Sequence, residues 1–201
     1  MEARQVFWSY DPSQAVRESE FPFCPRCGSR LREAEARGLS RDADERRPTC
    51  PSCGFVCYRN PLPGVVTLVE RDDHVLLGRR GQGTFRSGAW CLPGGFMEWS
   101  EDYLSAGRRE VREETGIDVK VRSILSVVTN YHSPRFHTLV VVLLAAPGGG
   151  ELRAGDDLEE VAWFPLAGPL PEMAFEADRH IVERFAADRL AGAPVDPAYA
   201  G

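Results

Sequence analysis

The stretch GGFMEWSEDYLSAGRREVREETGI, residues 94–117, decides the fold that this sequence predicts. Its second half has the character of a helix with crowded acidic side chains. At about 100° per residue, Glu110, Glu113 and Glu114 fall within one third of the helix circumference. Glu110 and Glu114 are a like-charge i,i+4 pair, which costs roughly 0.2–0.5 kcal/mol. A solvated helix would mix both signs of charge on this face, so the crowding indicates that cations neutralise the carboxylates.

The helix is expected to begin at Ser100, a favourable N-cap, and to end before Gly116, a favourable C-terminal stop. Leu104 and Val111 are seven residues apart and share an apolar face that can pack on a sheet. The acidic face lies beside this apolar face, so its carboxylates should point along the edge of the core toward a cleft. Such a set of hard oxygen ligands suits Mg²⁺ or Mn²⁺.

The sequence around this helix predicts an α/β domain with a mixed sheet covered on both faces. Two apolar runs around the turn-like RDD suggest a hairpin, and a short strand precedes the glycines at 94 and 95. A final amphipathic helix should face inward with Ile181, Val182 and Phe185. The expected elements are strands at 64–70, 74–80, 89–95, 118–129, 136–146 and 160–164, and helices at 100–115 and 174–190.

Composition limits the classes of function. The chain has 201 residues and a net charge of −6, which argues against a surface for duplex nucleic acid and implies that any phosphate partner needs cations. The N-terminus lacks the pattern of a secretory signal, and the longest apolar run, 139–146, is far too short to span a membrane. We therefore expect a cytoplasmic protein without a membrane partner.

The chain is expected to contain four parts: a lead at 1–22, a cysteine-rich segment at 23–60, the α/β domain at 61–190 and a flexible tail at 191–201. The second part holds two knuckle sequences, CPRCG and CPSCG, separated by 22 residues. Together they offer four thiolates for tetrahedral Zn²⁺. The ligands would be Cys24, Cys27, Cys50 and Cys53.

Two unconnected redox or buried cysteine pairs are the alternative to this four-cysteine zinc ribbon. A four-thiolate site is closed, which favours a structural role that supports a scaffold or a dimer. Zinc ribbons also bind nucleic acid or protein, but the acidic composition makes nucleic acid the weaker expectation. Cys57 and Cys91 fit no metal spacing and are expected to be buried free thiols.

The acidic stretch resembles the box of the Nudix hydrolases at every fixed position of that motif. In this chain these positions are Gly95, Glu101, Arg109, Glu110, Val111, Glu113, Glu114, Gly116 and Ile117. The resemblance implies an α/β/α sandwich and an enzyme that cleaves a nucleoside diphosphate linked to another group. A pyrophosphate repels hydroxide, so metal ions would neutralise its oxygens and activate water.

The resemblance also implies roles for individual residues. The three glutamates of the helix, assisted by the Gly95 carbonyl, would bind the catalytic Mg²⁺ or Mn²⁺, Arg109 would orient the carboxylates, and Glu101 would brace Arg109. The general base is open, because relatives use either a carboxylate of the box or a glutamate of a later loop. The loop candidates are Glu159 and Glu160 in GDDLEEVAWFPL, and we favour Glu160, although a solvated acidic loop is an ordinary alternative.

The ribbon and the following YRNP extend the resemblance over residues 24–185. Zinc-ribbon Nudix enzymes include NADH pyrophosphatases and a shorter group similar to FAD and ADP-ribose pyrophosphatases. The NADH group typically carries SQPWPFP after the box, whereas this chain has TNYHSPRFHTLVV, and only 23 residues precede the first cysteine. The layout therefore resembles the FAD or ADP-ribose type more closely.

Candidate substrate groups lie on both sides of the box. Arginines near the second predicted strand could contact phosphate, although arginines near a turn are commonly solvated, and side chains after the box could contact a base or flavin. Trp90 is expected to be core. The phosphate candidates are Arg79, Arg80 and Arg86, and the base candidates are Tyr131, His132, Arg135 and Phe136.

The main hypothesis is thus a metal-dependent hydrolase that releases a nucleoside monophosphate from a small-molecule nucleotide such as FAD or ADP-ribose. The alternatives are an NADH pyrophosphatase, an RNA-end decapping hydrolase and a regulator that senses a nucleotide without cleaving it. The complete acid set argues against the regulator, and the acidic charge argues against RNA. The resemblance also raises a homodimer as one arrangement.

Overall fold

The structure is a computed structural model that describes residues 21–35, 46–58, 60–133, 136–196 and 198. The chain divides into two compact units, with the division between Pro61 and Leu62. In the smaller unit, β1 (Arg32–Glu35) and β2 (Arg46–Thr49) form an antiparallel pair. The expected lead at 1–22 lies almost wholly outside the described residues.

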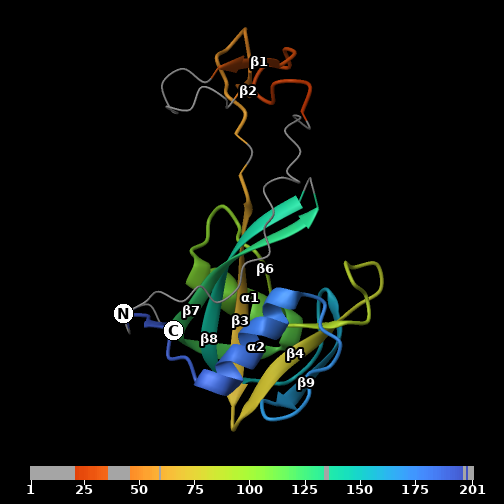
Figure 1. Cartoon of the computed structure of the whole chain (residues 1–201), viewed down its shortest axis with the longest axis vertical. Coiled ribbons are helices and arrows are strands. Elements are labelled where there is room, and N and C mark those ends of the chain that lie inside the picture. Colours follow the sequence, from red (N-terminus) through yellow and green to blue (C-terminus); the bar gives the residue numbers. More distant parts are fainter. Residues whose placement is uncertain (1–20, 36–45, 59, 134–135, 197, 199–201) are drawn as a thin grey trace. The chain divides into compact units, whose positions relative to one another are not determined.

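The larger unit contains two helices and a mixed sheet (Figure 1). Within the described residues the strand order is β10-β7-β8-β3-β4-β5, β6 pairs with β3, and β9 pairs with β4. Only the β3–β8 pairing is parallel among these. The elements are β3 (Leu62–Arg71), β4 (His74–Arg80), β5 (Trp90–Cys91), β6 (Gly94–Phe96), α1 (Tyr103–Thr115), β7 (Ile117–Ser133), β8 (Phe136–Gly150), β9 (Leu158–Pro165), α2 (Glu176–Asp188) and β10 (Ala193–Pro194).

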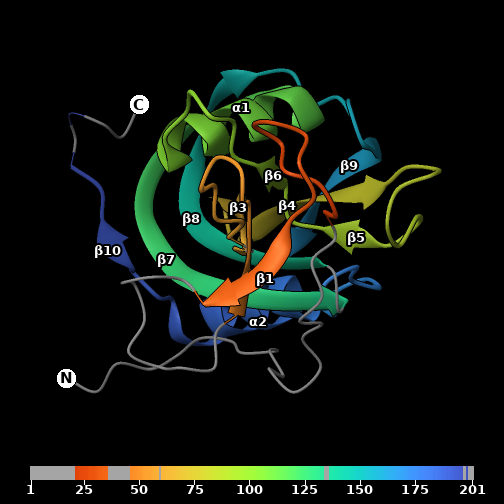
Figure 2. The ribbon, with the colours of Figure 1, turned by 90° about the horizontal axis from the view of Figure 1, so that it is seen from above.

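The central strands bury both faces, because their successive side chains alternate between two cores. On β3, Leu68 packs in the cluster that contains Ile181 and Phe185 of α2, whereas Val69 packs in the cluster that contains Val111 of α1. Figure 2 shows α1 and α2 on opposite sides of the sheet. The predicted α/β/α sandwich with a mixed sheet is therefore confirmed.

The structure corrects the predicted start of the acidic helix. Asp102, not Ser100, is the N-cap of α1, and its Oδ1 accepts hydrogen bonds from the N–H groups of Leu104 at 2.8 Å and Ser105 at 3.0 Å. A carboxylate can satisfy both amides at once, whereas a hydroxyl placed two residues earlier cannot reach them. The predicted end at Gly116 is confirmed, with a φ of 72°.

The predicted hairpin exists only at its turn. β3 and β4 pair through Glu70–Val75 and Arg71–His74 and then separate, since β3 continues beside β6 and β8 while β4 continues beside β9. The strands β7 and β8 are longer than predicted. Within the expected tail, β10 pairs with β7.

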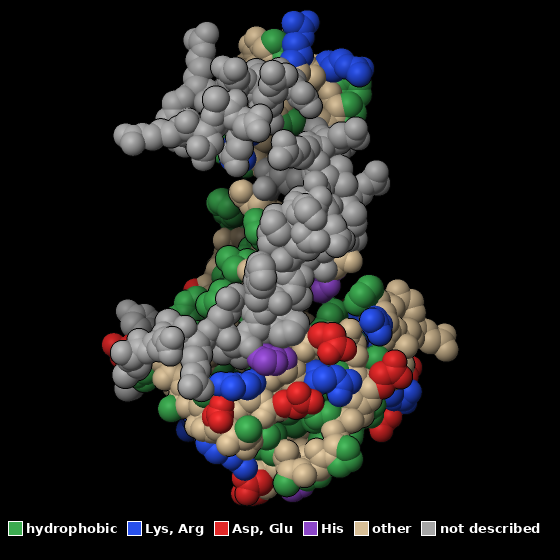
Figure 3. Space-filling model, viewed as in Figure 1, with side chains coloured by type: hydrophobic (Ala, Val, Ile, Leu, Met, Phe, Trp, Pro, Cys, Tyr) green, Lys and Arg blue, Asp and Glu red, His purple; other side chains and the backbone are tan. Residues whose placement is uncertain are grey.

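Charged side chains of both signs are interspersed on the described surface. Figure 3 shows acidic and basic groups mixed over the face that carries α2. In the part of the chain that is described, no helix is both long and apolar enough to cross a bilayer.

Candidate active site

Two of the three crowded glutamates on α1 point inward. Glu110 and Glu114 are buried, whereas the side chain of Glu113 is half exposed. This difference follows from the helix geometry, because α1 buries the face that contains Leu104 and Val111 and the acidic face lies next to it. The predicted orientation, along the edge of the core, agrees with these burial values.

Arg109 ties this acidic face to the loop that precedes the helix. Its guanidinium donates to Glu101 at 2.5 and 2.9 Å, to Glu110 at 2.8 Å and to Glu113 at 3.0 Å. It also donates to the backbone carbonyl of Phe96 at 3.1 Å. The hydrogen bonds from Arg109 lower the pKa of Glu101. Because a guanidinium carries its donors in a planar fork, one side chain can fix the positions of several carboxylates.

Two glycines allow the buried glutamates to approach the backbone of β6. The N–H of Gly94 donates to Oε2 of Glu114 at 2.8 Å. A Cβ added to Gly95 would lie 2.6 Å from Oε1 of Glu110, so a larger residue here would displace that carboxylate. The glycines of β6 therefore allow the carboxylates of α1 to contact the strand backbone.

The buried carboxyls lack full compensation of their negative charge. Burial raises the pKa of Glu110 despite its bond to Arg109. Burial also raises the pKa of Glu114 to about 8, and the hydrogen bond from Gly94 offsets only part of this rise. Buried oxygen ligands with unmet charge fit a divalent cation, which prefers carboxylate oxygen. Glu110, Glu113 and Glu114 are the residues that would hold it.

A second possible metal centre lies in the smaller unit. Among the residues that the structure describes, Cys24, Cys27, Cys50 and Cys53 form the one set of metal-ligating side chains whose donor atoms all lie within 4.8 Å of one another. Each knuckle closes through a bond from a glycine N–H to the first cysteine carbonyl, at 2.9 Å for Gly28 and 3.0 Å for Gly54. This geometry fits the predicted ribbon. By contrast, Glu110, Glu113 and Glu114 do not form such a set in the described part of the chain.

The other two cysteines are separate from this cluster. Cys91 is buried as predicted, but Cys57 is only half-buried, which corrects the expectation of a buried thiol.

A hollow of about 320 Å³ extends from Gly94 and Gly95 on the α2 side of the sheet. Its apolar base includes Val66, Val128 and Val140 of the central strands. Rings gather on its lining: His132 lies 4.9 Å from Phe136 and 5.8 Å from Phe175, measured between ring centroids. The aromatic lining residues are Phe85, Phe96, His132, Phe136 and Phe175. This combination of an apolar base and few polar groups is typical of a small-molecule site.

The structure brings together only some of the predicted substrate residues. Phe136, His132 and Arg80 line the hollow. Arg79 instead forms ion pairs with Glu159 at 2.6 Å and Glu160 at 2.8 Å on the β4–β9 ladder. The predicted general base, Glu160, is therefore paired with a predicted phosphate ligand.

The remaining substrate candidates lie elsewhere. Arg86 is exposed in the loop after β4 and does not line the hollow. Trp90 packs against the core, with its ring 4.7 Å from that of Phe164. The side chain of Tyr131 and the whole of Arg135 lie outside what the structure describes.

Two residues of the hollow, Phe175 and Asp178, were not candidates from the sequence, and Arg80 was a candidate only for phosphate. Arg80 is largely buried and its Nε donates to the Phe85 carbonyl at 2.6 Å. Phe175 immediately precedes α2, and Asp178 lies in the first turn of that helix. In the sequence, Asp178 looks like an ordinary acid that favours a helix N-terminus. Its burial among apolar neighbours was the signal that sequence alone could not supply.

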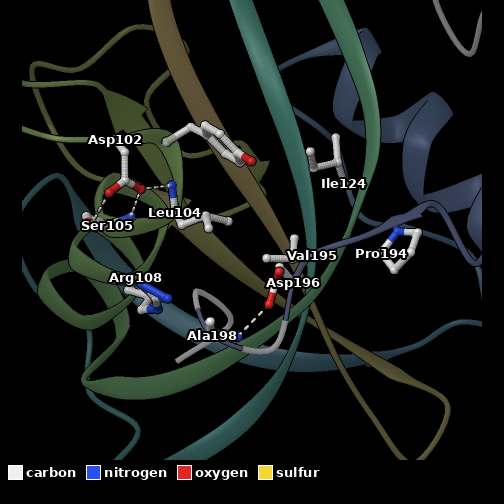
Figure 4. A pocket seen from close by; sticks show the side chains of 10 residues that line it. Asp102, Leu104, Ser105, Arg108, Ile124, Pro194, Val195, Asp196 and Ala198 are labelled. Atoms are coloured by element: carbon white, nitrogen blue, oxygen red, sulfur yellow. Dashed lines mark hydrogen bonds between the residues drawn. The ribbon is translucent and has the colours of Figure 1, made fainter.

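A larger hollow, of about 620 Å³, lies where the start of α1 faces β10. Figure 4 shows that its polar groups bond to their own local backbone: Asp102 caps α1, and Asp196 accepts from the N–H of Ala198 at 2.9 Å. These carboxylates are committed to local structure. The chemistry therefore favours the smaller hollow beside the glutamates.

Comparisons with known proteins agree with this geometry. Residues 60–185 match the family described as the NUDIX domain. The chain is 39% identical over 125 residues to an ADP-ribose pyrophosphatase of Methanocaldococcus jannaschii, which covers 62% of this chain and 73% of that protein. It is 33% identical over 179 residues to an NAD-capped RNA hydrolase of Pseudomonas aeruginosa, covering 87% of this chain but 59% of the relative. The chain thus spans about three fifths of the length of that relative.

A solved structure shares the fold. The crystal structure of a NUDIX hydrolase from Nitrosomonas europaea superposes with a TM-score of 0.70 at 27% identity, covering 87% of this chain and 96% of that one.

Proposed function

Because this chain belongs to the Nudix family, we propose that it is a pyrophosphohydrolase that cleaves a nucleoside diphosphate linked to another group. The observation that carries the proposal is the pair of buried, undercompensated carboxyls, Glu110 and Glu114, which lie against Gly94 and Gly95. These two glycines also line the aromatic hollow. Water would add to one phosphorus of the pyrophosphate while the bridging P–O bond breaks. The products are a nucleoside monophosphate and a phosphorylated second group.

The residues of the Nudix box have different proposed roles, metal binding and positioning. Glu110, Glu113 and Glu114 would hold Mg²⁺ or Mn²⁺, which when bound supplies charge neutralisation and an activated water. Arg109 holds Glu110 and Glu113 in place, and Glu101 holds Arg109. The position of the general base is an open part of the proposal. The ion pair with Arg79 weakens the case for Glu160, since the arginine already occupies Oε2 of that carboxylate.

An adenine nucleotide with a small second group, such as ADP-ribose or FAD, is the substrate class we favour. The similarity to an archaeal ADP-ribose pyrophosphatase supports it, as does a hollow near the lower end of the size range of small-molecule sites. An NAD-type substrate is the second candidate, because similarity to the NAD-capped RNA hydrolase extends over 179 residues and thus beyond the catalytic unit. The mixed charges in Figure 3 and the net charge of −6 speak against long contacts with an RNA backbone.

We propose Zn²⁺ as the ion of the four-cysteine cluster, with a structural role. The cluster uses all four cysteine ligands, so it leaves no open position for a substrate. A dimer supported by this unit remains a proposal from the family resemblance.

The proposal is tested by incubating the full chain with Mg²⁺ or Mn²⁺ and one of four substrates. AMP release is measured from ADP-ribose, FAD and NADH, and release of nicotinamide mononucleotide is measured from NAD-capped RNA. Glu114→Gln should reduce turnover at least about 100-fold, because loss of even an outer ligand in a metal site costs about 10–100-fold. Glu183→Gln, an exposed change on α2, is the matched control and should keep full turnover. Release of a nucleoside monophosphate from none of these substrates would refute the hydrolase assignment.

A further inference from the structure

Asp178 is a buried carboxyl that lines the hollow described above. It is 4% exposed and lies in the first turn of α2. Its Oδ2 accepts the N–H of Leu92 at 3.0 Å. Its Oδ1 accepts no hydrogen bond from any group within the described ranges. Burial raises the pKa of Asp178 to about 7, with Arg80 opposing part of the rise.

Local structure alone does not account for a carboxyl at this position. An asparagine could accept the same Leu92 N–H without the cost of burying a charge. The aromatic ring of Phe175, three residues earlier, and the ring of His132 line the same hollow. An acceptor that opens into an aromatic-lined space is suited to a flat heterocycle that carries an N–H donor on its edge.

The position of Asp178 relative to the glutamates fits the length of a nucleoside. Leu92 donates to Asp178, and Gly94, two residues later, donates to Glu114. Two residues of extended chain span at most roughly 7 Å. A nucleotide whose base lies at Asp178 is therefore long enough for its phosphate to reach Gly94 and Gly95, which contact Glu114 and Glu110 of α1.

We propose that Asp178 is a specificity-determining residue whose Oδ1 accepts a hydrogen bond from an N–H donor on the edge of the substrate's nucleobase. The donor is the exocyclic amine of adenine or the ring N–H of guanine. This inference deepens the proposed function, since it concerns the same site. It assigns base recognition to α2 and bond cleavage to α1.

The decisive experiment compares ligands that differ only at the base edge. Calorimetric titration of the full chain with Mg²⁺ should use AMP, GMP, purine riboside 5′-monophosphate (which lacks the amine) and ribose 5-phosphate. Hydrogen bonds to charged groups are worth about 1.5–3 kcal/mol, so AMP or GMP should bind about 10-fold more tightly than the purine analogue, or better. The stronger of the two identifies the base. Equal affinity of all three nucleotides, or no binding of any, overturns the proposal without the use of a variant.

Asp178→Asn tests the residue itself. The amide oxygen can still accept from Leu92, which turns its NH₂ toward the hollow, where it opposes a donor on the base. The preference for AMP or GMP over the purine analogue should disappear, while Asp188→Asn, an exposed change on the same helix, should retain it. A full preference in Asp178→Asn, in a variant that melts no lower than the wild type, contradicts the assignment.

Kinetics separate this proposal from the hydrolase assignment. With the hydrolysed dinucleotide, Asp178→Asn should raise KM about 10-fold and leave kcat within about 2-fold, because the lost contact is equal in ground and transition states. A fall in kcat at unchanged KM would show that Asp178 supports the acids instead. If the wild type shows the base preference yet releases AMP from no substrate, the hydrolase proposal fails and the recognition role stands.

Discussion

Glu114 and Asp178 show how the same functional group serves different purposes at short range. Each is buried and accepts one backbone N–H, Asp178 from Leu92 just after β5 and Glu114 from Gly94 at the start of β6. Glu114 lies beside other acids, which fits a cation, whereas Asp178 lies among rings, which fits a heterocycle. The neighbours, not the carboxyl itself, determine the chemistry.

Asp178 should make stability depend on pH. Its pKa of about 7 in the folded protein lies above the ordinary 3.8, so the unfolded chain releases a proton that the folded protein keeps. The stability that this retained proton gives the folded protein is fully present below about pH 4 and is lost as the pH rises toward and through 7. The total loss in the free energy of unfolding is about 4 kcal/mol. Asp178→Asn should therefore gain stability relative to wild type between about pH 4 and pH 8. Urea unfolding of both proteins without Mg²⁺ measures this gain at each pH. A difference in the free energy of unfolding that stays constant with pH would contradict the prediction.

Gly95→Ala should damage activity more than stability. Its Cβ would lie 2.6 Å from Oε1 of Glu110, so the carboxylate must move. We expect a loss of at least about 10-fold in kcat/KM, since a displacement near 1 Å at reacting groups can cost about 100-fold. Gly148→Ala is the control, because its Cβ would meet ordinary contacts at 3.5 Å. Equal activity of both variants would show that the close approach is unimportant.

At the scale of elements, the N-cap Asp102 should stabilise the start of α1. Asp102→Ala removes the acceptor for Leu104 and Ser105, which should cost about 1 kcal/mol. The melting temperature should fall by roughly 4 °C or less. Ser100→Ala, at the position first expected to cap the helix, should change it little. A larger effect at Ser100 would contradict the observed helix start.

The sequence predicted those elements whose signals are local. The acidic face of α1, the end of α1 at Gly116 and the inward face of α2 follow from periodicity and from glycine at a left-handed position, whereas the box was identified by its resemblance to a family. The hollow could not be predicted, because Phe85, His132 and Phe175 come from three separate segments that only the folded sheet brings together. The same holds for Arg79 and Glu160, whose pairing depends on the register of β4 and β9.

On the scale of the whole molecule, the two units should separate in function. Cys50→Ser removes one ligand of the four-cysteine cluster, so the bound Zn²⁺ should fall and the smaller unit should unfold at a lower temperature. Hydrolysis should persist within about 2-fold, since Glu110 and Glu114 belong to the other unit. Metal analysis, a thermal melt and AMP release measure the three quantities together. Loss of hydrolysis with an unchanged melt and zinc content would contradict a structural role.

The short segment from Leu92 to Gly94 also determines which products can form. If it holds the base through Asp178 and the phosphate through the acids of α1, it fixes the distance between the base site and the phosphate site. Only the nucleoside half of the substrate is positioned in this way, so the group beyond the second phosphate can vary in size without moving the scissile bond. A range of dinucleotide-like molecules would then yield one common nucleotide, and the chain would be selective for what it releases rather than for what it receives.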